Sequence, residues 1–209
     1  MKNRFHYNYE IDDQGYIRIL HMPYKTRYVE LPREDRFRKL YSYVLIDIDF
    51  EHTIGYLEAC KQSSSPIIKE GLFKMAVVQY AKCYSPAKHG GRSQITENKV
   101  YKGIEGDPIG CHRKFMERRM KYFAHDESDY LQAQVGALLN MDAKKYVGCL
   151  YPRKQAKFDY DETIDILMTL CNAAQNWVKN EIDAALEEVS NYIKELDFKV
   201  LTSYQDMRV

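Results

Sequence analysis

Residues 160–197 contain neither glycine nor proline, and this stretch strongly limits the folds open to the chain. Apolar residues recur in it mostly at intervals of three and four, the spacing of one face of an α-helix. They are Ile164, Leu167, Cys171, Ala174, Val178, Ile182, Ala185, Val189 and Leu196. A helix of about 36 residues is about 54 Å long, which exceeds the width of a small domain. We therefore predict one long helix that is kinked or packs its end on a second subunit.

Three shorter helices are expected before this one. The second and third begin where a capping residue is followed by proline, a pair that is typical of helix starts. The expected helices cover about 33–61, Ser65-Pro66 to Ser85-Pro86, and Asp107-Pro108 to about 125. Residues 85–106 hold four of the ten glycines. We expect a long loop there.

Two segments alternate apolar and polar residues, which predicts β-hairpins. The first covers residues 4–20, with its turn at Asp12-Asp13-Gln14-Gly15. The second lies within residues 131–158, with its turn near Met141-Asp142. The expected fold class is therefore mostly α (α+β).

The domain organisation follows from this order of elements. The N-terminal β-hairpin and an irregular connector occupy residues 1–33. Residues 34–209 form a helical bundle domain, with a short β-hairpin insertion before the long helix.

Composition and cysteine spacing exclude several classes of protein. Lys and Arg number 31 and Asp and Glu 30, so a globally basic nucleic-acid binder is excluded. No window approaches the roughly 20 apolar residues of a membrane span. The N-terminus lacks the apolar region of a signal peptide. Five scattered cysteines without a C-x-x-C motif indicate reduced thiols, and we expect a cytoplasmic protein.

Charge is nevertheless segregated along the chain. Residues 71–96 contain four Lys or Arg and no acid, and residues 143–158 contain five and no acid. Residues 159–188 carry eight acids and one lysine. A local positive face would attract an anionic ligand. Solvated helix faces are the alternative interpretation.

Two clusters resemble metal or nucleotide sites only superficially. Asp47, Asp49, Glu51 and His52 lie close together on the first helix, but no second ligand cluster accompanies them. We interpret them as a solvated helix face. The glycine-rich run 103–110 fits neither the dinucleotide fingerprint nor the P-loop. We therefore expect no metal and no cofactor.

The third predicted helix carries the most informative residues. Residues 112–126 contain five Lys or Arg, and Arg118 and Arg119 precede His125 by seven and six residues. Seven residues turn a helix by about 700°, so Arg118 and His125 would lie on nearly the same side of the helix. Arg119 would lie about 120° around the helix from His125. Asp126 is positioned to bias the tautomer of His125. A surface-basic helix whose terminal His caps carbonyls is the alternative.

The chemistry of this residue pair points to RNA. Arginine neutralises a phosphate with a planar fork. Histidine titrates near neutrality and moves protons. Together they suffice to cleave RNA without a metal, because RNA carries its own nucleophile, the 2′-hydroxyl.

The stretch from Arg119 to Asp126 resembles the signature of HEPN domains, which is Arg, four to six residues, then His, late in a helix. Arg119, Lys121, Ala124 and His125 match the bacterial Arg-Asn-Lys-x-x-Ala-His version. Met120 stands where the family usually has a polar residue. The resemblance implies a helical bundle, usually a homodimer in which two motifs face each other across one cleft.

The resemblance also implies a function and roles for residues. Many members are metal-independent endoribonucleases, often toxins of toxin–antitoxin systems or phage-defence proteins. Arg119 would hold the phosphate, and His125 would act as acid and base or orient the scissile group. Supporting positions are Arg118, Lys121, Tyr122, Asp126 and His112.

Two other hypotheses stay open. The first is a non-catalytic dimeric HEPN-like module that binds a nucleotide, RNA or a partner protein such as an antitoxin. The second is an unrelated, mostly helical interaction protein. No membrane partner is expected.

Overall fold

The computed structural model describes residues 9–20, 27–32, 35–85, 93–120, 131–133, 136–142, 144–150, 153–155 and 160–206. The chain is mostly helical, as predicted. It forms two compact units, one of residues 42–182 and the other of residues 1–41 with 183–209. The predicted domain division at residue 33 stays a prediction.

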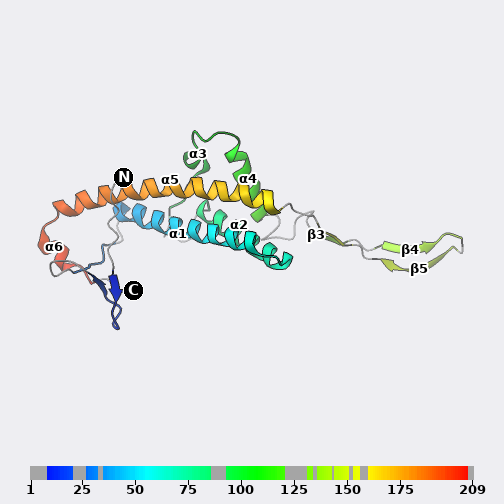
Figure 1. Cartoon of the computed structure of the whole chain (residues 1–209), viewed down its shortest axis with the longest axis horizontal. Helices are drawn as coiled ribbons and strands as arrows, with labels where there is room; N and C mark the ends of the chain where they lie inside the picture. The colour runs from blue at the N-terminus through cyan, green and yellow to red at the C-terminus, as the bar shows by residue number, and fades with distance from the viewer. Residues whose placement is uncertain are drawn as a thin grey trace. The chain divides into compact units, whose positions relative to one another are not determined.

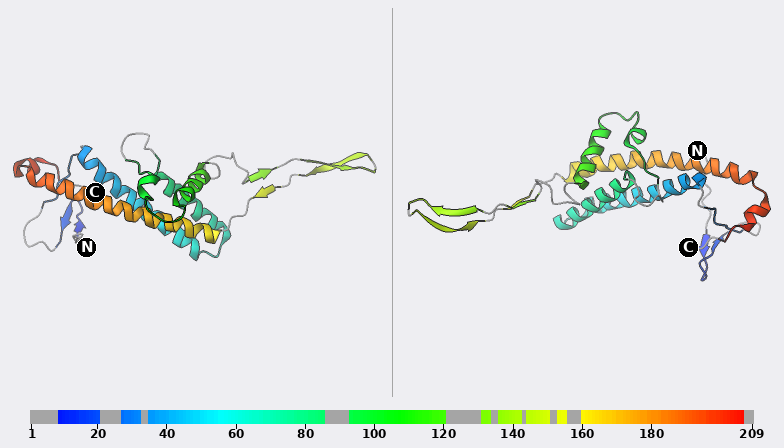
Figure 2. Two further views of the ribbon diagram at one scale, coloured as in Figure 1. Left: turned by 90° about the horizontal axis from the view of Figure 1, so that it is seen from above. Right: turned by 180° about the vertical axis from the view of Figure 1, so that it is seen from behind.

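The larger unit is built around four helices that share one core. These are α1 (Asp35–Gln62), α2 (Pro66–Cys83), α4 (Pro108–Arg118) and α5 (Tyr160–Glu195). Within this unit α1 and α5 run side by side (Figures 1 and 2). An edge-to-face contact of Tyr43 with Trp177 and an ion pair of Lys61 with Asp165 join them. The long helix α5 is confirmed.

The start of each helix follows from local chemistry. Asp107 precedes α4 and accepts a hydrogen bond from the Gly110 amide at 2.8 Å, which confirms the predicted cap. Ser65 stands at the corresponding position before α2, but its side chain makes no capping bond. Proline at the first position then defines the start of α2.

The prediction of a loop over residues 85–106 is wrong in one part. A single helical turn, α3 (Glu97–Val100), lies within it. It brings Val100 and Tyr101, both buried, into the core of the larger unit. Two residues of the segment that was expected to be a loop therefore contribute to the core.

The β insertion is confirmed and is longer than one hairpin. Strands β4 (Gly136–Asn140) and β5 (Lys145–Leu150) pair antiparallel around a turn at Met141-Asp142, as expected. Strands β3 (Leu131–Ala133) and β6 (Arg153–Gln155) form a second antiparallel pair. Exposed apolar side chains lie on the β4–β5 hairpin, among them Leu139 and Tyr146.

The smaller unit contains the predicted N-terminal hairpin and the helix α6 (Phe198–Ser203). Strands β1 (Tyr9–Ile11) and β2 (Ile17–Ile19) pair antiparallel. The Asp12 carboxylate accepts the amides of Gln14 and Tyr16 and thereby fixes the turn. Arg27 ties the connector to the C-terminal segment through Asp206 and the Thr202 carbonyl.

The five cysteines are free thiols, as their spacing predicts. Across the part of the chain that is described, every helix is either too short or too polar to traverse a lipid bilayer.

Candidate functional site

The C-terminal end of α4 holds the two arginines that the sequence singles out. Helix α4 ends at Arg118, and Arg119 and Met120 continue it as a wider, π-type turn. Such turns occur frequently at functional sites. The Arg119 amide bonds to the carbonyls of Phe115 and Met116.

The two arginines have different surroundings. The Arg118 guanidinium carbon lies 5.4 Å from the ring centroid of Phe115, a buried core residue, which is a cation–π geometry. Arg119 is half-buried, and its Nη1 lies 3.6 Å from the Met120 sulfur. Within the described residues Arg119 forms no ion pair with a carboxylate. Of the two, Arg119 therefore has the guanidinium that is more available to an anion.

The other residues of the predicted site lie outside the described part of the chain. They are Lys121, Tyr122, His125 and Asp126. The pairing of Arg119 with His125 therefore remains a prediction.

His112 lies nearer the start of α4, in the core rather than beside the arginines. Six residues separate it from Arg118, a rise of about 9 Å along a helix. It is 4% exposed, and its Nδ1 lies 2.8 Å from the hydroxyl of Tyr80. Burial lowers the pKa of His112 to about 4. His112 is therefore neutral near pH 7.

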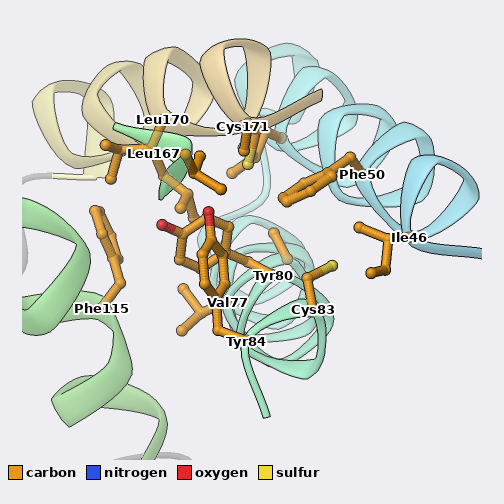
Figure 3. Packing of buried hydrophobic residues seen from close by; sticks show 14 of the residues in the cluster. Ile46, Phe50, Val77, Tyr80, Cys83, Tyr84, Phe115, Leu167, Leu170 and Cys171 are labelled. Carbon is orange, nitrogen blue, oxygen red and sulfur yellow. The ribbon is translucent and has the colours of Figure 1, made fainter. Parts of the chain in front are cut away.

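Three tyrosines complete a buried cluster around His112. The Tyr101 hydroxyl lies 2.7 Å from the hydroxyls of both Tyr80 and Tyr84. The rings of Tyr80 and Tyr84 point from α2 into the middle of the core (Figure 3). Burial raises the pKa of Tyr80 and of Tyr84 well above the usual value. All three hydroxyls are therefore protonated and able to donate.

Sequence reasoning missed this cluster. Tyr80 lies on α2 and Tyr84, four residues later, is the residue that caps its C-terminus, a spacing that places both on one side of the helix. That spacing, in a chain with 18 tyrosines, is the signal that was available. Tyr101 gave no such signal because it follows α3 in the segment expected as a loop.

The prediction that the acidic cluster on α1 forms a solvated face is wrong in part. Glu51 and His52 are exposed, as a solvated face requires. Asp49 instead is buried, and its carboxylate lies 2.6 Å from Gln79 Nε2 and 3.0 Å from Lys82 Nζ. Among the described residues, no group of three or more His, Cys, Asp and Glu is arranged to hold a metal ion.

The basic stretch 71–96 is less positive in the fold than in the sequence. Lys82 pairs with Asp49, and Lys74 pairs with Glu70 at 2.6 Å. Acids from outside the stretch thus neutralise two of its four cations.

Comparison of the chain with protein-family models, with curated proteins and with solved structures found no match.

Proposed function

We propose that the chain is a HEPN-like, metal-independent endoribonuclease that acts in the cytoplasm, in a toxin or phage-defence role. The observation that carries the proposal is the signature from Arg119 to His125, which begins at the end of a basic helix. The surroundings of Arg119 support it, because no carboxylate of the described chain competes for this guanidinium.

The proposed reaction uses the nucleophile that RNA carries. Arg119 binds the scissile phosphate and neutralises charge that develops on its oxygens. His125 moves the proton between the 2′-hydroxyl and the 5′-oxygen that leaves. The 2′-oxygen then bonds to phosphorus, which leaves a 2′,3′-cyclic phosphate on the 5′ fragment. DNA lacks the 2′-hydroxyl and is not cleaved.

The test is cleavage of single-stranded RNA in excess EDTA. His125→Ala should lower the rate about 10²–10⁴-fold, the range for one acid–base group. Arg119→Ala should also lower it, and Arg119→Lys should restore it only in part, because the bidentate fork is lost. Arg118→Ala is the matched control, since the Arg118 guanidinium packs on Phe115. Cleavage that survives both His125→Ala and Arg119→Ala would refute the proposal.

One contact favours a non-catalytic binding module as the second candidate. The Met120 sulfur lies against Arg119 Nη1, at a position where the family usually has a polar side chain. If Met120 blocks catalysis, wild-type protein will bind RNA without cleaving it, and Met120→Asn will restore cleavage in EDTA.

We also propose that the chain acts as a homodimer. The core side of α2 is buried, and its outer surface carries exposed apolar side chains between its charged ones. Ile67 is 79% exposed, Ile68 54%, Met75 50% and Val78 39%. Contiguous exposed apolar side chains often mark a protein–protein contact. A second copy would cover this surface.

Light scattering at micromolar concentration tests the dimer. We expect twice the chain mass of 24.7 kDa. Met75→Lys on α2 should yield the monomer mass, because it places a charge in the interface. Val200→Lys, at an equally apolar exposed position on α6, should leave the dimer intact. A monomer mass for the wild type would contradict the assembly while leaving the RNase test unaffected.

A further inference from the structure

A cavity of about 230 Å³ lies between the segment 101–111 and helix α5. Both sides of it belong to the larger unit. Its walls are mainly apolar. They include Tyr101, Ile104, Cys111, Ile166, Leu170 and Ala173. Small-molecule sites have this character, with apolar walls and a few placed polar groups.

The charged groups at this cavity have one sign. Glu105 and Asp107 contribute to its lining, and among the described lining residues there is no Lys, Arg or His. The Asp107 carboxylate is held in place by the amide of Gly110. Within the described residues Glu105 forms no hydrogen bond and no ion pair. The cavity therefore combines an apolar surface with two exposed carboxylates.

We propose that this cavity is a binding site for a small ligand with an apolar body and a cationic amine head. The apolar walls remove the body from water. Glu105 and Asp107 attract the ammonium group. The inference concerns a surface formed by residues 101–107, α4 and α5 and does not depend on RNA cleavage.

A cysteine in the cavity wall supplies a direct readout of binding. Cys111 is half-buried in the wall, and Cys149 on strand β5 is exposed and serves as an internal control. The full-length protein is treated with iodoacetamide at fixed pH, and mass spectrometry follows the alkylation of each thiol. The probe is n-hexylamine. Hexanoate, with the same chain length and the opposite charge, is the matched control.

The expected result is selective protection of Cys111. Hexylamine should slow the alkylation of Cys111, with half of the maximal protection at about 1 mM. An affinity of this size is within reach of so small a ligand. Alkylation of Cys149 should not change. Hexanoate should give no protection at the same concentration. Glu105→Gln should weaken the effect of hexylamine about two- to five-fold, the size expected for one solvent-exposed charge.

Two variants close the cavity in different ways. Ala173→Leu fills it from α5, and Ile104→Trp covers it from its exposed rim. Each should abolish protection, and circular dichroism confirms that each is folded. Equal protection by hexanoate would overturn the proposal. Protection that persists in both folded variants, or its absence with hexylamine at about 10 mM, would do the same.

Discussion

Replacing Tyr101 by phenylalanine tests whether the buried hydroxyl cluster stabilises the larger unit. The Tyr101 hydroxyl is shared by Tyr80 and Tyr84, at 2.7 Å from each. Phenylalanine keeps the ring and removes only this oxygen. Tyr80 retains its bond to His112, whereas the Tyr84 hydroxyl loses the bond that the structure assigns to it.

The size of the effect follows from counting these bonds. A buried hydrogen bond contributes about 1 kcal/mol net, and a buried polar group without a partner costs about 1–3 kcal/mol. Tyr101→Phe removes the bonds to Tyr80 and Tyr84 and a longer one, of 3.4 Å, to the Leu170 carbonyl, and it orphans one hydroxyl. It should therefore lower the free energy of unfolding by about 2–4 kcal/mol. Tyr84→Phe is the matched control. It removes one bond and leaves Tyr101 bonded to Tyr80, so about 1 kcal/mol is expected.

Urea unfolding followed by circular dichroism measures both values. The decisive sample is the double variant Tyr84→Phe/Tyr101→Phe. It removes the orphaned hydroxyl, so it should be at least as stable as Tyr101→Phe alone, and the two single effects should not add. Additive losses, or equal losses for the two single variants, would refute the shared-hydroxyl account.

Two further predictions concern the first turns of α4. Because burial lowers the pKa of His112 to about 4, the unfolded chain binds a proton that the folded chain excludes between about pH 6.5 and 4. Stability should therefore fall by about 1–3 kcal/mol as the pH drops through this window, and it should fall less in His112→Gln. Urea titrations at several pH values measure both proteins. Parallel curves of stability against pH for the wild type and His112→Gln would contradict the prediction. A Cβ on Gly110 would lie 2.0 Å from Asp107 Oδ2, so Gly110→Ala displaces the cap and offsets its gain in helix propensity. In an Asp107→Ala background, Gly110→Ala should stabilise the protein by up to about 1 kcal/mol, because no cap is left to displace. Thermal unfolding measures the change in both backgrounds, and an equal effect of Gly110→Ala in the two would contradict the role of Asp107 as a cap.

Local sequence signals were sufficient for the elements that they fully determine. The helix from Tyr160 to Glu195 needs only an apolar stripe and the absence of glycine and proline. The start of α4 needs only the pair Asp107-Pro108. The β4–β5 turn lies at the predicted Met141-Asp142.

Features that depend on distant partners were not predictable in this way. Asp49 lies on the core side of α1, and the groups that bond to its Oδ1, on Gln79 and Lys82, are 30 and 33 residues away. Tyr101 likewise takes its role from α2. For the candidate site, the motif indicates Arg119 and the contacts separate it from Arg118, while its pairing with His125 stays a prediction.

Helix α4 links the packing of the core to the proposed chemistry. Asp107 caps its first turn, His112 bonds to Tyr80, and Phe115 is buried one turn further on. Arg119 follows directly after the last residue of α4, in the π-type turn. A functional side chain is placed most precisely when packing locks the element that carries it. The tyrosine cluster thus holds in place the helix whose C-terminal end leads into Arg119. Loss of the cluster should therefore impair the placement of this guanidinium without removing any group that takes part in the reaction.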